Sequence, residues 1–283
     1  MRVLKSYLED RFVAGADPAT ELHNATTGEV CATTSTRGLD LGAALAHART
    51  LVDGGAWGVD IGAVSSNPDS AGLPPEEELT RVRALSRPLR AAGIRVSVDT
   101  FAPTVQRALA DEVDLLNDIR GFPDPGVWPA LAESRCDLVV MHSIQDGRAD
   151  RRDSDPDTIV DRVLRFFDAR LSELVDAGIA EERLIVDPGM GFFLGNTPEA
   201  SVAVLRAIPR LRAATGRPVL ISVSRKSFLG AMLGGRPPSA RHDATVAAER
   251  YAVEQGAAWI RTHDPRALQD ALAIDARLRA IPS

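Results

Sequence analysis

Polar side chains stand at the ends of seven short apolar runs in this sequence. The runs end, in chain order, with Asp60, Asp99, Asn117, His142, Asp187, the trio Ser224, Arg225 and Lys226, and the pair Arg261 and His263. Carboxylate and amide oxygens accept hydrogen bonds, whereas guanidinium and ammonium groups donate them and attract anions. If the runs are parallel strands of a barrel, their carboxyl ends meet at one mouth, so these groups would surround a single site.

The predicted site has an acceptor side and a cationic side. Asp99, Asn117 and Asp187 suit the edge of a flat heterocycle that carries several N–H groups. Lys226, Arg261 and His263 come from the last two runs, and the loops after strands 7 and 8 are the recurrent phosphate site of barrels. We therefore predict a heterocyclic substrate that carries a phosphate or pyrophosphate group.

Turn and cap chemistry offers another explanation for the acidic positions. Asp, Asn and Ser are favoured in turns and at helix N-caps, so Asp60 or Asp118 alone fits a cap as well as a ligand contact. Cations are different, because the N-terminal end of a helix disfavours positive charge. Arg225, Lys226, Arg261 and His263 are therefore better explained by a function than by capping.

The elements that must position these groups alternate from residue 39 onward between helical and strand patterns, which is typical of parallel βαβ units. We predict strands at 58–62, 95–99, 114–118, 137–142, 184–189, 218–225 and 257–263. Helices are predicted at 41–55, 75–93, 103–112, 125–134, 157–178, 199–216, 227–234, 243–256 and 265–281. Nearly continuous apolar strands suit a sheet closed on itself.

The fold class predicted from this pattern is α/β, a (β/α)8 TIM barrel, and 283 residues is a suitable length for it. A doubly wound open sheet is the main rival, but the glycine-rich GxGxxG turn that would favour it is missing. Residues 1–38 form an atypical N-terminal segment and residues 39–283 the barrel. The best strand candidate in the segment, GEVCATT at 28–34, is poor as a barrel strand, so the barrel is either closed some other way or left open.

Composition excludes several functional classes. A net charge of -6 disfavours a nucleic-acid partner. The start of the chain lacks the apolar core of a signal peptide, and no run of about 18 apolar residues predicts a membrane span. Cys31 and Cys136 stand apart without a CxxC motif, which argues against a zinc site or a disulfide framework. We therefore expect a cytoplasmic protein.

Six motifs resemble, in order and spacing, those of the dihydropteroate synthases over roughly residues 50–280. They are SVDT at 97–100, LND at 116–118, VVMH at 139–142, DPGMGF at 187–192, SRKSFLG at 224–230 and RTHD at 261–264. SRKSFLG and DPGMGF are specific when they occur together. The stretches NDIRGFPDP and DPGMGFFL look closest to the sulfonamide-insensitive type of this family, which is carried on mobile elements.

The resemblance implies a transferase of folate biosynthesis that joins p-aminobenzoate to 6-hydroxymethyl-7,8-dihydropterin pyrophosphate and releases pyrophosphate, usually with Mg2+. It implies a homodimer and an enzyme linked to antibiotic resistance. Asp99, Lys226, Arg261 and His263 would be the catalytic residues. By position, the pterin would be held by Asp99, Asn117, Met141, Asp187 and Lys226, the pyrophosphate by Arg261 and His263, and the p-aminobenzoate by Pro68, Phe192 and Ser227.

Two stretches depart from the family pattern. Where the family's second loop reads GGESTRPG, residues 62–69 read GAVSSNPD, so Asn67 replaces an arginine. The usual first strand and its N-x-T-x-D-S-F loop, whose Asn helps to bind Mg2+ and pyrophosphate, are missing. Residues 1–48 instead resemble the opening of an aldehyde dehydrogenase of the phenylacetate-degradation type, without its cofactor or cysteine machinery. The alternative function is therefore a pterin-binding barrel with impaired or no synthase activity.

Overall fold

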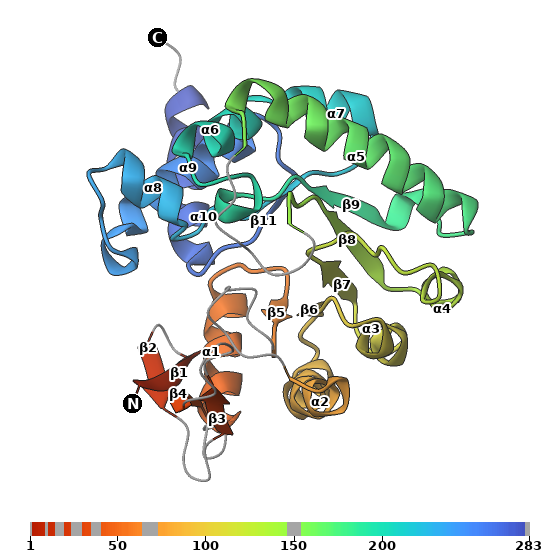
Figure 1. Ribbon diagram of the computed structural model, residues 1–283. Helices are drawn as coiled ribbons and strands as arrows, with labels where there is room; N and C mark the ends of the chain where they lie inside the picture. The colour runs from red at the N-terminus through yellow and green to blue at the C-terminus, as the bar shows by residue number, and fades with distance from the viewer. Residues whose placement is uncertain are drawn as a thin grey trace.

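Seven parallel strands form the wall of a barrel, and helices cover its outer face (Figure 1). The computed structural model describes residues 2–8, 11–14, 20–23, 30–34, 41–63, 73–145 and 154–280. The barrel strands of this part are β5 (Val59–Ile61), β6 (Val96–Asp99), β7 (Leu115–Asp118), β8 (Asp137–Met141), β9 (Leu184–Asp187), β10 (Leu220–Ile221) and β11 (Trp259–Ile260). Strands β5 to β9 pair in chain order, β10 pairs with β11, and a bridge between Val186 and Val219 joins the two groups. The prediction of a barrel is therefore confirmed.

The helices follow the strands in the expected order. They are α1 (Leu41–Asp53), α2 (Pro75–Ala91), α3 (Pro103–Leu109), α4 (Trp128–Glu133), α5 (Pro156–Asp176), α6 (Pro198–Arg206), α7 (Ile208–Thr215), α8 (Ser227–Met232), α9 (His242–Glu254) and α10 (Pro265–Ala280). Short 3-10 helices lie at Glu181–Arg183, Gly191–Phe193 and Pro238–Ala240. None of the described helices is both long and apolar enough to cross a membrane.

Three predicted elements differ from the structure, namely one helix and the last two strands. The single helix predicted at 199–216 is divided into α6 and α7 at Ala207, because Pro209 has no backbone N–H for the helical hydrogen bond and its ring crowds the preceding turn. The last two strands are much shorter than predicted. Their polar ends, including Ser224 and Arg261, leave the ladder and form the loops at the mouth.

Two layers of apolar side chains hold the barrel together. The larger layer lies between strands and helices and contains Val98, Leu116, Val140 and Val186. The smaller one lies inside the barrel and is made by Leu115, Val139, Ile185 and Leu220, with Trp259 packed against it. Because side chains along a strand alternate between its two faces, this pair of layers shows which residues of each strand point inward.

The N-terminal segment forms a separate sheet in the described residues. Its strands are β1 (Arg2–Leu8), β2 (Arg11–Ala14), β3 (Thr20–His23) and β4 (Val30–Thr34), in the order β2-β1-β4-β3. The candidate at 28–34 thus contains a strand, β4, but this strand pairs with β1 and β3 rather than with the barrel. Among the described strands β5 pairs only with β6 and β11 only with β10, so no strand pairing closes the seam between β5 and β11. Trp57 and Trp259 meet there edge to face, with ring centroids 4.9 Å apart.

Candidate active site

The alternation of side chains decides which polar strand ends face the inside of the barrel. On β7, Leu115 is in the inner layer, so Asn117 points inward and Asp118 outward. The same two-residue step leads from inward Ile185 to Asp187 on β9 and from Trp259 to Arg261 after β11. The strands therefore bring these three predicted site residues to the same mouth.

Arg261 lies at the centre of the charged groups. Its guanidinium Nη2 is 2.5 Å from Asp60 Oδ2 and 3.0 Å from Asp99 Oδ2. Burial raises the pKa of Asp99 to about 6, although Arg261 opposes this shift. Burial disfavours the charge of Arg261, but Asp60, Asp99 and Asp187 outweigh it and raise the pKa of this guanidinium above its ordinary value. The predicted division into an acceptor side and a cationic side needs a correction, because Arg261 joins the two.

Asp187 and Asn117 are buried acceptors. Asp187 Oδ1 accepts a hydrogen bond of 2.8 Å from the Gly189 N–H, and burial raises the pKa of the carboxyl group to about 6. Gly189 has φ 75°, and a Cβ atom there would lie 2.5 Å from the carbonyl oxygen of His142, so the turn requires glycine. Asn117 Oδ1 is buried without a hydrogen-bond partner in the described part of the chain. Buried polar atoms are usually paired, so Asn117 is ready for a ligand donor.

Lys226 extends over the turn that follows Asp187. Its Nζ lies 5.2 Å from the centroid of the Phe193 ring and donates to the carbonyl oxygen of Met190 over 3.4 Å. Burial lowers the pKa of Lys226 to about 8, while Asp187 opposes this shift. The preceding residue, Arg225, has the left-handed φ of 58°, which is uncommon for a residue with a side chain.

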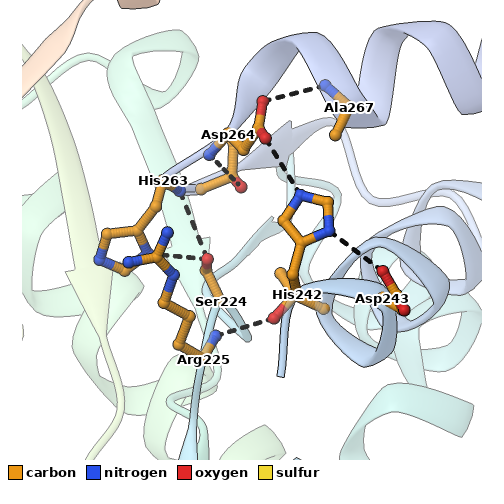
Figure 2. A network of polar contacts seen from close by, with 9 residues as sticks. Ser224, Arg225, His242, Asp243, His263, Asp264 and Ala267 are labelled. Atoms are coloured by element: carbon orange, nitrogen blue, oxygen red, sulfur yellow. Dashed lines mark hydrogen bonds and ion pairs between the residues drawn. The ribbon is translucent and has the colours of Figure 1, made fainter. Parts of the chain in front are cut away.

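His263 lies beside the end of β10, as Figure 2 shows. Its Nδ1 is 2.7 Å from Ser224 Oγ, and its backbone N–H donates to the same hydroxyl oxygen over 3.3 Å. The imidazole ring is exposed at the surface. Ser224 thus orients the predicted pyrophosphate ligand His263 from the loop that follows β10.

A cavity of about 810 Å3 opens at the mouth and extends along the seam between β5 and β11. Asn117, Lys226, Arg261 and His263 line it. Asp99 and Asp187 lie next to these groups, since Arg261 acts on both carboxylates. Ligand pockets commonly measure about 300–1,000 Å3, so the cavity has room for a substrate of two rings.

The remaining predicted residues are less closely joined to this cavity. Met141 and Phe193 pack with Ile119 in a small apolar cluster at the mouth. Phe192 is 37% exposed, and Ser227 begins helix α8. Pro68 and Asn67 lie outside the described residues.

His142 is not a site residue, although its run of residues ends at the mouth. It follows inward-pointing Met141 and so points outward, where its ring meets Phe166 edge to face at 5.3 Å. Burial lowers its pKa to about 4, so it is neutral near pH 7. Conversely, Ser97 was missed: its hydroxyl donates to Asp60 over 2.5 Å and orients the partner of Arg261. Ser97 lies two residues before Asp99 on β6, so both side chains are on the same face of the strand. This spacing could have identified Ser97 from the sequence.

The described residues contain no group of three or more acidic, histidine or cysteine side chains that could hold a metal ion. Two carboxylates at the site, Asp60 and Asp99, both pair with Arg261. Cys136 is buried, and burial raises its pKa, which suits a small core residue rather than a nucleophile.

The fold and the site define a barrel enzyme whose mouth is lined with both carboxylates and cations. Residues 20–263 match the family model described as pterin binding enzyme. The chain is 51% identical over 238 residues to the type-2 dihydropteroate synthase of Escherichia coli, covering 84% of this chain and 88% of the relative. It is 45% identical over 245 residues to the type-1 enzyme of Pseudomonas aeruginosa, covering 86% and 88%.

Solved structures give the same picture. A dihydropteroate synthase of Burkholderia cenocepacia, complexed with 7,8-dihydropteroate, has a TM-score of 0.77 and 38% identity over 88% of this chain and 94% of its own. A Xanthomonas albilineans enzyme with 4-aminobenzoic acid also has a TM-score of 0.77, with 36% identity over 88% and 89%. The chain therefore belongs to the dihydropteroate synthase family of transferases.

The resemblance of residues 1–48 to an aldehyde dehydrogenase stays a prediction, as does the boundary at residue 38. The pterin binding enzyme model begins to match at residue 20, within that segment.

Proposed function

We propose that this chain condenses p-aminobenzoate with 6-hydroxymethyl-7,8-dihydropterin pyrophosphate and releases pyrophosphate. The observation that carries the proposal is the convergence of buried acceptors and cations: Asn117, Lys226, Arg261 and His263 line one cavity, and Asp99 and Asp187 adjoin it. Acceptors suit the N–H groups of a pterin, and cations suit the pyrophosphate.

In the proposed reaction, the bond between the pterin methylene carbon and the pyrophosphate oxygen breaks, and the oxygen keeps the electron pair. Asp99, Asn117, Met141, Asp187 and Lys226 would hold the pterin, and the acceptors Asp99, Asn117 and Asp187 would stabilise its developing positive charge. Arg261 and His263 would stabilise the departing pyrophosphate. The aniline nitrogen of p-aminobenzoate then attacks the methylene carbon and loses a proton. No covalent enzyme intermediate is needed, because preorganised charges stabilise the transition state.

The co-substrate side of the site is proposed from position. Phe192 is exposed at the mouth next to Phe193, and Ser227 follows Lys226, so both can border an aromatic ring bound beside the pterin. We propose that Pro68 also borders the p-aminobenzoate.

Mg2+, which the resemblance implies, finds no ligand set in the described residues. Magnesium is usually held by one or two carboxylates together with substrate phosphates. Asp60 and Asp99 could serve only by giving up Arg261, to which both are paired. We assign Mg2+ no step in the reaction.

The test is release of pyrophosphate by the purified chain in the presence of both substrates, measured in a coupled assay. Turnover that requires p-aminobenzoate supports the synthase. The alternative, a pterin-binding barrel without activity, is motivated by the seam between β5 and β11, where no described strand stands in place of the family's first strand. Tight binding of the pterin ester without turnover would favour that alternative.

Sulfonamide insensitivity is a separate prediction, motivated by Phe193 and Leu194, which stand where the common family pattern continues with Gly-Lys. Both side chains are buried, so they act through the path of the loop that carries Phe192. We expect the half-inhibitory concentration of a sulfonamide to exceed that of an ordinary synthase at least about tenfold, equal to about 1.4 kcal/mol. Equal inhibition of the two enzymes, assayed at the same p-aminobenzoate concentration, would show that the loop does not discriminate.

Binding of the pterin ring is expected to depend on pH with two limits. The pKa values of Asp99 and Asp187 are raised to about 6, so their acceptor carboxylates are lost as the pH falls through this value. The pKa of Lys226 is lowered to about 8, so its charge is lost as the pH rises through that value. Affinity should therefore be greatest between the two, with limits that belong to coupled groups.

The measurement is titration with 6-hydroxymethyl-7,8-dihydropterin, which carries no phosphate that would itself titrate in this range. An affinity that stays constant from about pH 5 to about pH 9 would contradict the assignment of these ligands.

We further propose a cytoplasmic homodimer formed through the outer helices. Ile274 and Leu278 are 57% and 65% exposed and lie one turn apart on α10, an apolar pair of the kind found at interfaces. Light scattering measures the mass in solution.

A further inference from the structure

Behind the strand ends that carry Arg261 and His263, helix α9 buries a carboxyl group. Glu249 is 0% exposed, and neither of its carboxyl oxygens has a hydrogen-bond partner among the described residues. The Thr262 hydroxyl faces this group as a hydrogen-bonding partner that favours its carboxylate form, but at a geometry too long or too bent for a formed hydrogen bond. Burying a carboxyl group without a hydrogen-bond partner costs folding free energy, so Glu249 calls for an explanation.

A small cavity adjoins this group. Its volume is about 10 Å3, and Glu249, Thr245, Thr262 and Ser224 are among the residues that line it. This volume is close to that needed for one water molecule, and the lining is polar enough to hold one. A single water can therefore bridge Glu249 to Thr262.

Helix α9 faces the strand ends with three polar residues on one side, namely His242, Thr245 and Glu249, at spacings of three and four. Two of them contact the loops that carry Arg225 and Asp264, as Figure 2 shows for His242. Thr245 Oγ1 accepts from the Arg225 N–H over 3.0 Å, and His242 Nε2 is 3.1 Å from Asp264 Oδ2. Glu249 is the third residue of this row, opposite Thr262.

Thr262 stands between Arg261 and His263 in the chain. We propose that Glu249 is a positioning residue, whose buried carboxyl group holds Thr262 through one water and thereby fixes the two neighbouring side chains, Arg261 and His263, for pyrophosphate. This inference rests on the proposed function. Glu249 does not touch substrate, since its side chain lies on α9, behind the strand ends.

The charge state of Glu249 agrees with this role. Burial, together with the charge of Asp264, raises its pKa to about 7, while Thr262 and His242 oppose this shift. The other charged or titratable groups around the small cavity are Arg225 and His263. Below pH 7 the carboxyl group is neutral and can donate its proton to a water. Above pH 7 a negative charge appears behind the cations and opposes the binding of pyrophosphate.

The test compares Glu249→Leu, which cannot hydrogen bond, with Glu249→Gln, which can but does not titrate. At pH 6.5 we expect Glu249→Leu to weaken the binding of inorganic pyrophosphate, and to raise the KM for the pterin ester, about five- to tenfold, with the KM for p-aminobenzoate unchanged. Glu249→Gln should retain wild-type affinity at pH 6.5 and weaken less than the wild type between pH 6.5 and pH 7.5, below the range in which Lys226 loses its charge. Glu254→Gln, on the exposed side of α9, is the control and should behave as the wild type.

Calorimetric measurement of pyrophosphate binding separates the role of Glu249 from the proposed synthase activity. A wild type that binds pyrophosphate but shows no turnover counts against the proposed function alone. If Glu249→Leu does not fold, the pH dependence of Glu249→Gln decides. The inference is overturned if Glu249→Gln retains the wild-type pH dependence, if folded Glu249→Leu binds pyrophosphate within about twofold of the wild type, or if the wild type binds none.

Discussion

Replacing Arg261 by alanine is expected to lower kcat/KM for the pterin ester about 10²- to 10³-fold, the effect of removing one preorganised charge-stabilising donor. The guanidinium is the group that pairs with Asp60 and Asp99 and that we propose to bind the departing pyrophosphate. Without it, the pKa of Asp99 rises further, since Arg261 now lowers it. The variant therefore loses the anion site and also part of the carboxylate that would hold the pterin. Steady-state kinetics with both substrates measure the effect.

The matched variant is Arg261→Lys, which keeps the positive charge but not the planar arrangement of donors. We expect an intermediate loss, because lysine can attract pyrophosphate without spanning two carboxylates. Thermal unfolding distinguishes loss of activity from loss of structure. If Arg261→Ala, properly folded, retained kcat/KM within about threefold of the wild type, the proposed role of Arg261 would be wrong.

Replacing Asp187 by asparagine is expected to weaken binding of the pterin ring about 100-fold, or about 2.7 kcal/mol, as for hydrogen bonds to a charged group. One carboxylate oxygen already accepts from the Gly189 N–H, and the charge of the group is balanced by Lys226 and Arg261. An amide of the same size keeps the packing but removes the charge and half of the accepting capacity. Titration with 6-hydroxymethyl-7,8-dihydropterin near pH 7 measures the loss.

Asp118→Asn is the control for this prediction, because Asp118 is also buried but points outward. Its carboxylate accepts from the backbone N–H groups of Arg120 and Phe122 and from Gln106. We expect Asp118→Asn to lower the unfolding temperature while the affinity for the pterin changes little. Equal effects of the two substitutions on pterin affinity would mean that the loss reflects general disturbance of the mouth.

The described residues contain no barrel strand between β5 and β11, and this seam bears on both predictions. Asp60 lies in β5 at the open seam and pairs there with Arg261, which follows β11 on the other side. In the described part of the chain this ion pair and the Trp57–Trp259 contact span the seam. The charged site therefore also joins the two edges of the barrel.

Much of the site could be predicted from the sequence, because its residues stand at the ends of apolar runs. Asn117, Asp187, Lys226 and Arg261 were all found in this way, and the structure gathers them at one mouth. His142 satisfied the same rule and yet points outward. A polar residue after an apolar run marks the end of a strand. It does not show whether the side chain points into the barrel, because that depends on which alternate residues of the strand face inward.

Other features lay beyond the pattern. The ion pairs of Arg261 with Asp60 and Asp99 join residues about 160 to 200 positions apart, and no local spacing predicts them. Glu249 reads in the sequence as one more acidic residue of an amphipathic helix. Only the packing of α9 against the ends of β10 and β11 removes it from water.

By itself, the sequence determined most helices and strands of the barrel, their parallel order and the chemical types at the strand ends, because periodicity, capping and chain connectivity are local properties. The tertiary structure decided which of two adjacent polar residues enters the barrel, which carboxylates share Arg261, and which acids are raised in pKa by burial. These depend on distances between remote segments and on exclusion of water, and neither quantity exists until the barrel has formed.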